Sequence, residues 1–179
     1  VVAVLGVLFI FAFINIASYR SDRVEAWKHP ETAGDKGYQT MQALYAIGSG
    51  KLFGKGLGKS LQKLGFIPES QNDMIFSIIC EELGLFGAMC IILVFALMLW
   101  RIIHIAQNAP DLFGTMLAAG VFAHVAVQVV LNIAVVTNFI PNTGVSLPFI
   151  SYGGTSLLFL MAMGGMLLNI SRYPKDREN

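Results

Sequence analysis

The strongest constraint on the fold is the stretch 74–100, which is apolar over the length of a membrane crossing yet carries Glu81 and Glu82. The hydrocarbon core of a bilayer requires about 20 consecutive apolar residues in a helix. Carboxylates inside such a run are energetically expensive, and by default they indicate a functional site. A third acid, Asp73, stands directly before the run, at its boundary with a polar segment. We therefore predict a transmembrane helix with one acid at the water boundary and two deeper acids.

Three further apolar runs, at 1–19, 113–136 and 155–171, are also long enough to span a membrane. Charged residues make up only 13% of the chain, against roughly 25% in soluble domains. We predict an all-α, polytopic transmembrane helical bundle. The net charge of +1 gives no field that would attract a nucleic acid. Because the chain begins inside an apolar run and without methionine, we expect an N-terminal part to be missing.

Polar and small residues share one face of the 74–100 helix. Steps of three and four residues connect the members of this stripe, Asp73, Ser77, Glu81, Gly84 and Ala88. Glu82 points in roughly the opposite direction. A stripe of this kind packs against other helices in a membrane. We expect Glu81 to face the bundle interior and to meet His124, Gln128 or a cation from outside this sequence, because an unpaired buried charge is strongly destabilising.

The 113–136 run carries a polar ladder of His124, Gln128 and Asn132, spaced four residues apart. We interpret this ladder chiefly as hydrogen bonding between helices. Metal binding by His124 is disfavoured, because no second histidine or cysteine stands at ligand spacing.

The connection 20–72 is long and polar. A short amphipathic helix near the membrane surface is predicted at 38–47. Four lysines then recur at every fourth position, Lys51, Lys55, Lys59 and Lys63, with glycines interspersed. Glycine makes a continuous helix doubtful. A loop of backbone N–H groups and lysines suits an anionic ligand, and a plain solvated basic loop is an equally good interpretation. Trp27 either anchors at the membrane interface or packs on the protein surface.

The segment 137–154 is rich in helix-breaking and turn-forming residues, yet it is apolar enough to lie at membrane depth. Its distinctive residues are Pro141, Gly144, Pro148, Ser151, Gly153 and Gly154. Proline and glycine rule out a continuous helix here. We predict a re-entrant-like loop that folds back over one end of the bundle and does not form a span.

Three stretches, 37–70, 72–88 and 132–156, resemble the SEDS family (shape, elongation, division and sporulation), that is, FtsW, RodA and SpoVE. The last of them, NIAVVTNFIPNTGVSLPFISYGGTS, is similar to the family signature. The AWKHPE stretch at 26–31 resembles the division and sporulation branch. Where this chain has Asn138 and Ser146, the family usually has glycine and proline, respectively.

The resemblance implies a ten-helix protein of the bacterial cell membrane, of which this chain supplies the last four spans. The 20–72 loop would be extracytoplasmic and the C-terminus cytoplasmic. This loop holds eight of the twelve Lys and Arg residues, a distribution that the positive-inside rule would assign to the cytoplasm. We follow the family, because the loop is near the length at which that rule weakens.

The resemblance also implies a peptidoglycan glycosyltransferase that polymerises lipid II during cell division or sporulation. Its partners would be a class B penicillin-binding protein transpeptidase and other division or elongation membrane proteins. Two alternatives are a lipid II flippase and a non-catalytic scaffold for the transpeptidase.

The acid of the family's PE-x-x-x-D motif is its catalytic residue, and it corresponds to Asp73. The alternative is that Asp73 only caps the following helix. The four lysines would bind the substrate's diphosphate, and Glu69 would also belong to the substrate site. A divalent cation, Mg or Mn, would suit the oxygen ligands of Asp73 and Glu69.

Overall fold

The chain forms a bundle of helices with a polar cap at one end. The computed structural model describes residues 23–32, 34–62 and 71–173, and every regular element within these ranges is helical. A helical turn at 23–28 precedes the four long helices, α2 (Gly34–Gly50), α3 (Ile75–Gln107), α4 (Leu112–Val136) and α5 (Gly154–Arg172). Three of them, α3, α4 and α5, are long and apolar enough to cross a membrane. The all-α transmembrane prediction is confirmed, and the predicted 1–19 span lies outside the described residues.

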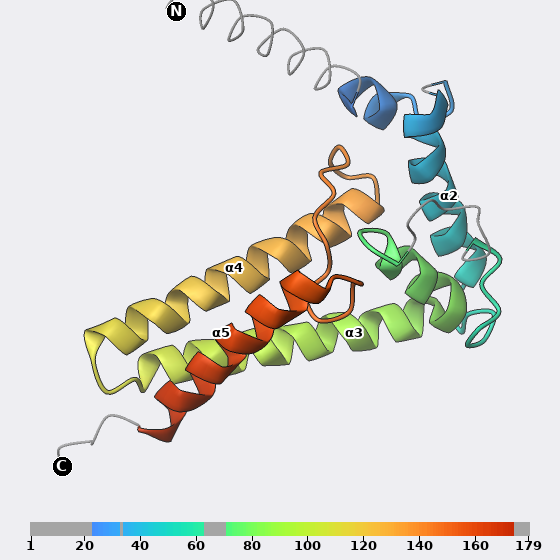
Figure 1. Cartoon of the computed structure of the whole chain (residues 1–179). Coiled ribbons are helices and arrows are strands. Elements are labelled where there is room, and N and C mark those ends of the chain that lie inside the picture. Colours follow the sequence, from blue (N-terminus) through green and yellow to red (C-terminus); the bar gives the residue numbers. More distant parts are fainter. Residues whose placement is uncertain (1–22, 33, 63–70, 174–179) are drawn as a thin grey trace, which may run out of the picture.

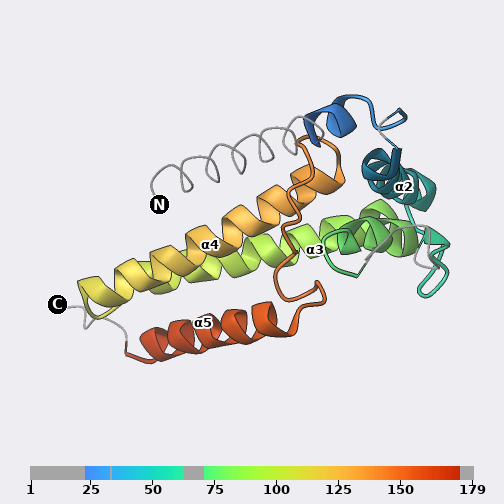
Figure 2. The same cartoon turned by 45° about the horizontal axis from the view of Figure 1, so that its top comes forward.

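The three long helices lie roughly parallel to a common axis. α3 and α4 run side by side in opposite directions, and α5 lies along the pair with fewer contacts (Figures 1 and 2). Apolar residues of α3 and α4, such as Phe95, Val121 and Val125, form the buried core between them. α2 packs instead on the first part of α3 (Figure 1). This arrangement places α2, the start of α3 and the end of α4 at the same end of the bundle.

The helix bounds agree with the predicted spans except at the end of α3. α4 and α5 begin and end within one residue of the predicted runs at 113–136 and 155–171. α3 continues to Gln107, beyond the predicted end at residue 100, because Arg101 and His104 extend the helix on exposed positions. The chain then turns sharply, and Asp111 caps α4 by accepting a hydrogen bond from the Gly114 backbone N–H at 2.8 Å.

α3 is broken at Gly84, where φ is 68° and ψ is −167°. A break leaves backbone groups without helical partners, and in a membrane each of these must be satisfied by protein. The loop after α2 supplies the partners. Its N–H groups donate to the carbonyls of Glu81 and Glu82, each at 2.9 Å, and its carbonyls accept from Leu85 at 2.9 Å and Phe86 at 3.1 Å. The acids therefore lie in the short first part of α3, next to a loop that is joined to it backbone to backbone.

Glycines permit this close approach. A Cβ on Gly54 would lie 2.2 Å from the Glu82 carbonyl oxygen, and a Cβ on Gly50 would lie 1.9 Å from the Cys80 carbonyl oxygen. From the sequence we expected the glycines of this loop to belong to an anion-binding or solvated loop. The structure gives two of them a different task, which is to let the loop dock on the broken helix. The helix predicted at 38–47 is longer at both ends, since α2 spans Gly34–Gly50.

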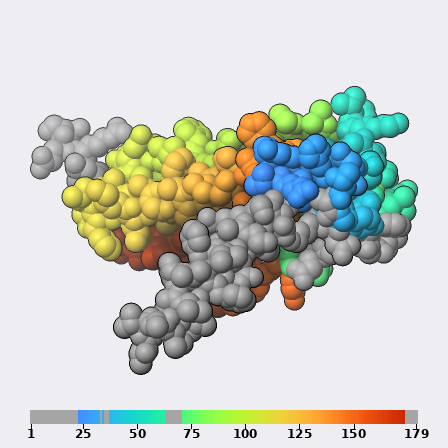
Figure 3. Space-filling model, turned by 90° about the horizontal axis from the view of Figure 1, so that it is seen from above, coloured from blue at the N-terminus to red at the C-terminus, as the bar shows by residue number. Residues whose placement is uncertain are grey.

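The segment 137–153 contains no helix and folds back over the polar end of the bundle, as predicted. It packs against the segment 23–32, as the view from above shows (Figure 3). Trp27 donates from its indole nitrogen to the Asn138 carbonyl at 3.0 Å, and Arg23 donates to the Asn142 carbonyl at 2.6 Å. Trp27 thus packs on the protein itself, the second of its two proposed roles.

One tight turn closes the end of this loop. Leu147 and Ser151 exchange two hydrogen bonds around the buried Pro148: the Leu147 N–H donates to Ser151 Oγ at 2.7 Å, and the Ser151 N–H donates to the Leu147 carbonyl at 3.0 Å. Gly153 is extended, and α5 begins at Gly154.

The docking of the loop on α3 predicts different effects for two matched substitutions. Gly54 and Gly58 have nearly the same φ, +76° and +75°, but a Cβ on Gly58 would meet nothing within 4 Å. Both Gly54→Ala and Gly58→Ala carry the strain of a left-handed alanine, on the order of 1–2 kcal/mol. Gly54→Ala should lose roughly a further 1–3 kcal/mol through overpacking. Thermal unfolding of the full-length protein in detergent measures both, and equal melting temperatures would contradict the docking.

Candidate functional site

Asp73 lies in the turn 71–74, directly before α3, and its side chain is half-buried. Its carboxylate faces the 137–153 loop: a Cβ built on Gly144 would lie 4.0 Å from Asp73 Oδ2. Gly144 itself has a φ of +69°, which favours glycine at this position. Met74, and not Asp73, occupies the cap position of α3, and no side-chain hydrogen bond caps the helix from there. The alternative that Asp73 only caps this helix stays a prediction.

Asn132 joins the Asp73 turn to the loop. It is fully buried on α4, and its Nδ2 donates to the Asp73 carbonyl at 2.7 Å and to the Val145 carbonyl at 2.8 Å. The Tyr152 backbone N–H makes a second link by donating to the Gln71 carbonyl at 2.8 Å. From the sequence we expected Asn132 to form hydrogen bonds between helices, as part of a polar ladder. Its partners are backbone carbonyls of the site, which the four-residue spacing alone could not show.

Glu81 is fully buried, as expected for a residue facing the interior, and it is surrounded by donors. Lys55 Nζ lies 2.6 Å from Oε1 and Ser60 Oγ lies 2.5 Å from Oε2. Two longer hydrogen bonds, each of 3.4 Å, come from Ser49 Oγ and the Gln62 backbone N–H. A buried charge that is both paired and hydrogen-bonded meets the requirement for burial.

The expected partners of Glu81 were wrong. His124 is exposed and Gln128 is half-buried on α4, and Lys55 of the loop takes the role foreseen for them. The physical reason is the break at Gly84, which brings the loop against α3. Glycine at position 84 was visible in the sequence, but it fitted the small-residue stripe equally well.

The lysines do not form one stripe. Lys55 is engaged by Glu81, whereas Lys51 and Lys59 are exposed. Lys63 and Glu69 lie outside the described residues. Lys55 therefore acts within the fold, although its side chain is 33% exposed, and Lys51 and Lys59 are exposed as well.

Glu82 lies on the other face of α3, as predicted, and lines a cavity of about 300 Å³ with Gln71, Leu57, Ile75, Ile78, Ile79 and Leu83. Its Oε1 is buried and makes no hydrogen bond among the described residues.

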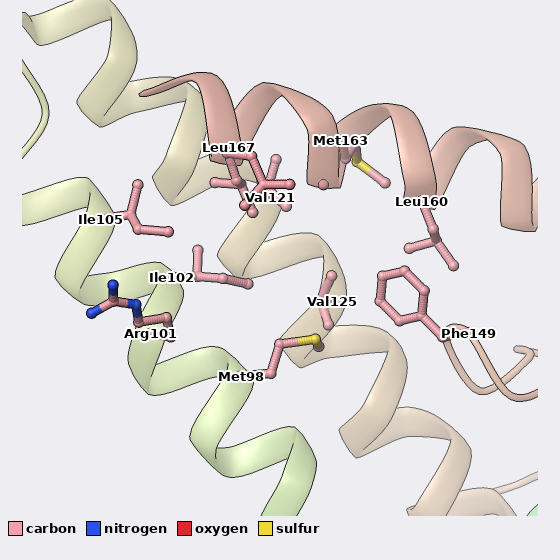
Figure 4. Close-up of a pocket in the computed structure, with 12 residues that line it drawn as sticks. Met98, Arg101, Ile102, Ile105, Val121, Val125, Phe149, Leu160, Met163 and Leu167 are labelled. Atoms are coloured by element: carbon pink, nitrogen blue, oxygen red, sulfur yellow. The ribbon is translucent and has the colours of Figure 1, made fainter. Parts of the chain in front are cut away.

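A second cavity, of about 290 Å³, lies between α3, α4 and α5 and is lined almost entirely by apolar side chains. Phe149 of the 137–153 loop lies at one end of it and Arg101 at the other (Figure 4). Met98, Val125 and Met163 are among the residues of its walls. A space of this character accepts a hydrocarbon chain far better than a polar group.

Asn138 has a φ of +57°, the left-handed region. The family that the sequence resembles usually has glycine here, and asparagine is among the non-glycine residues that adopt this region most readily. Its side-chain nitrogen also lies 3.4 Å from the Trp27 carbonyl. The departure from the family pattern is therefore compatible with the same backbone turn.

Taken together, the fold and the site define a multi-pass membrane protein with a half-buried aspartate at one end of its helical bundle. The sequence profile of the FtsW, RodA and SpoVE family, described as "Cell cycle protein", matches residues 1–176. The chain belongs to this family, and the predicted resemblance is confirmed.

Stage V sporulation protein E of Bacillus subtilis is 47% identical over 175 residues, which cover 96% of this chain and 48% of that relative. The probable peptidoglycan glycosyltransferase FtsW of the same organism is 44% identical over 161 residues, covering 89% and 40% of the two chains. The protein of that description from Trichlorobacter lovleyi is 43% identical over 164 residues, covering 91% and 43%. The chain thus spans about half the length, or less, of the curated relatives it matches.

Two solved structures share the fold. A chain of a peptidoglycan synthase complex, solved to explain how polymerization and crosslinking are coordinated, matches with a TM-score of 0.68 at 24% identity, over 94% of this chain and 48% of that one. The rod shape determining protein RodA of Thermus thermophilus, crystallised as an aspartate-to-alanine variant, matches with a TM-score of 0.56 at 33% identity, over 76% of this chain and 40% of that one.

The Glu81 cluster predicts that Lys55 contributes to stability. Lys55→Ala leaves a buried carboxylate without its cation, a change that destabilises proteins by roughly 3–5 kcal/mol when both partners are buried. The Lys55 side chain is 33% exposed, so we expect the lower part of that range. Lys59→Ala, at an exposed lysine of the same loop, should leave the melting temperature nearly unchanged.

A double variant tests the cause. Lys55→Met with Glu81→Gln removes both charges and should recover much of the lost stability. If Lys55→Ala melts like the parent protein, or if the double variant is as unstable as Lys55→Ala, the ion pair does not have this role.

Proposed function

We propose that this chain is part of a peptidoglycan glycosyltransferase that polymerises lipid II into glycan strands, with Asp73 as the general base. The observation that carries the proposal is the Asp73 carboxylate, half-buried at the end of the bundle and facing Gly144 of the loop. The relatives from B. subtilis and T. lovleyi that carry the name of this activity support it, as does the family.

The proposed reaction joins two lipid-linked sugars. A hydroxyl oxygen of one sugar forms a bond to the anomeric carbon of the other, whose bond to the lipid diphosphate oxygen breaks. The diphosphate leaves with the electron pair, and Asp73 takes the hydroxyl proton. A base serves this step when it lies within hydrogen-bond reach of the proton, and positive charge stabilises the departing diphosphate.

We propose fewer lysines for binding the diphosphate than the sequence suggested. Lys55 is held by Glu81, so Lys51 and Lys59 are the described lysines that we propose for contact with the diphosphate. We also propose Lys63 and Glu69, which lie outside the described residues, for the substrate site on the chemistry of their side chains. The apolar cavity that begins at Phe149 suits the lipid of such a substrate.

We also propose a divalent cation, Mg or Mn, for which the described residues supply few ligands. Within residues 23–32, 34–62 and 71–173, no three His, Cys, Asp or Glu side chains gather as metal ligands. Mg²⁺ is commonly held by one or two carboxylates together with substrate phosphates. We propose that Asp73 would hold such a cation together with the substrate's phosphates and with Glu69, which lies outside the described residues, and that the cation would add positive charge beside the diphosphate.

The flippase alternative draws on one observation, the broken helix with a buried acid, because transporters often bind their cargo at broken helices. The groups freed by the break at Gly84 are, however, hydrogen-bonded to the loop, and Glu81 is paired with Lys55. We therefore favour the polymerase. Full-length protein reconstituted with lipid II distinguishes the three functions. A polymerase makes glycan strands, and a flippase translocates lipid II without making strands. A scaffold does neither.

We further propose that the protein acts with a class B penicillin-binding protein, in division or sporulation. Support comes from its family and from the fold match to a chain of a peptidoglycan synthase complex.

The base proposal predicts the effect of Asp73→Asn. This variant nearly preserves shape, and asparagine caps helices as well as aspartate does. It should fold, bind the transpeptidase and polymerise lipid II roughly 10²- to 10⁴-fold more slowly. Asp111→Asn is the matched control, because Asp111 is a true helix cap away from the site and should keep full activity. Polymerisation within a few-fold of the parent would mean that Asp73 is not the base.

The proposed topology places the loop outside the cell and the turn between α3 and α4 inside. The 25 residues of α4 extend over roughly 37 Å, which is enough to separate its two ends across a bilayer. In a background with Cys80 and Cys90 replaced by alanine, a cysteine at the exposed Thr143 should react with an impermeant maleimide on intact cells. A cysteine at Pro110 should react only after permeabilisation, and the reverse pattern would invert the topology.

A further inference from the structure

We propose that Asn132 is a positioning residue, which holds the backbone beneath Asp73 and the loop opposite it at a fixed separation. This inference rests on the proposed role of Asp73 as the base, and it assigns the residue that sets the base's place.

One amide nitrogen makes both links. Asn132 Nδ2 carries two hydrogens, and it has one carbonyl oxygen at 2.7 Å, from Asp73, and a second at 2.8 Å, from Val145. Both partners can only accept, so the nitrogen rather than the oxygen of the amide must face them. The same side chain thus holds the residue that bears the carboxylate and the neighbour of Gly144, the residue that this carboxylate faces.

Asn132 is buried, but one of its hydrogen-bonding atoms has no partner among the described residues. Its side chain is fully buried, and Oδ1 has no hydrogen-bond partner among the described residues. An unsatisfied buried oxygen lowers stability, and a leucine of similar size would remove that penalty but would leave the Asp73 and Val145 carbonyls without their donor. What asparagine supplies at this position is therefore the pair of hydrogen bonds that joins these two carbonyls.

The rest of the ladder provides a comparison. Gln128 lies one turn earlier on α4 and is half-buried, and its Oε1 is also buried without a hydrogen bond among the described residues. It therefore shares with Asn132 the amide group and a buried oxygen without a partner, but among the described residues no hydrogen bond joins it to the site. Gln128→Leu is accordingly the matched control for Asn132→Leu.

The test uses the full-length protein with its transpeptidase partner and lipid II in liposomes. Asn132→Leu removes both donors at about the same volume, and ionised Asn132→Asp also removes them but places a buried charge beside two carbonyl oxygens, so it should be the less stable variant. For Asn132→Leu we expect kcat to fall 10- to 100-fold with KM changed less than threefold, in a protein that stays folded with a melting temperature lowered by several degrees, because two carbonyls lose their donor. Gln128→Leu should keep kcat, KM and melting temperature.

A double variant shows whether Asn132 acts through Asp73. Residues that work as a unit have non-additive effects. Asn132→Leu should lower the activity of the parent but leave the residual activity of Asp73→Asn unchanged. A further loss of tenfold or more in the double variant would overturn the assignment, because Asn132 would then act independently of the base.

A distance measurement tests the same link without activity. Spin labels at the exposed Gln71 and Thr143, in a background with Cys80 and Cys90 replaced by alanine, report the separation of the turn and the loop. We expect one narrow distribution in the parent and in Gln128→Leu, and a broadened or longer one in Asn132→Leu and Asn132→Asp.

The outcomes separate the two proposals. If Asp73→Asn stays active, the base assignment fails, and the label distances still decide whether Asn132 joins the turn to the loop. If Asp73→Asn is inactive but both Asn132 variants keep full kcat and the narrow distance, the positioning role is overturned. Failure of both variants to fold would also overturn it, since Asn132 would then serve stability.

Discussion

The arrangement of the polar end depends on the break of α3 at Gly84. A helix of membrane length that changes direction must find new partners for its backbone, and here the loop after α2 supplies four hydrogen bonds to residues 81–86. These bonds fix the loop against α3 and bring Lys55 to Glu81. The two parts of α3 can therefore have different roles, a short part that carries Ser77, Glu81 and Glu82 at the end of the bundle and a long apolar part within it.

The charged residues of this region divide into two groups. Lys55 and Glu81 satisfy one another in the interior, where a charge must be paired and hydrogen-bonded. Asp73 is half-buried and faces the loop, and we propose that its carboxylate serves the chemistry. Asn132 connects the two segments on which this placement depends. An acid deep in an apolar run thus supports the fold, and the acid at its boundary is the candidate for function.

Local sequence patterns predicted the helices well. The apolar runs foretold α4 and α5 to within one residue, and proline and glycine foretold the helix-free loop at 137–153. The face of α3 that carries Ser77 and Glu81 was also correct, because a 3.6-residue period decides which residues point inward. Asp73 was found through the resemblance to a family motif, since a single acid before a helix has no pattern that distinguishes a base from a cap.

Long-range partners could not be predicted in the same way. Lys55 and Glu81 are 26 residues apart, and Asn132 and Asp73 are 59 apart, so no periodicity connects them. The lysine spacing suggested a stripe, but positive φ angles at Lys51, Gly54, Gly56 and Gly58 turn the chain away from a helix. Gly84 shows the same ambiguity, because a glycine in an apolar run fits both a close helix contact and a break. Which of the two applies depends on the loop that docks there.

The most direct measurement is a structure of the full-length protein with a non-hydrolysable lipid II analogue bound as acceptor. The account predicts that the accepting sugar hydroxyl lies within about 2.6–3.2 Å of the Asp73 carboxylate, the distance at which a side chain can take a proton. It also predicts that Asn132 still bridges the Asp73 and Val145 carbonyls in that complex. An acceptor hydroxyl bound at another acidic residue, with Asp73 separated from the sugar by more than one water, would contradict the account.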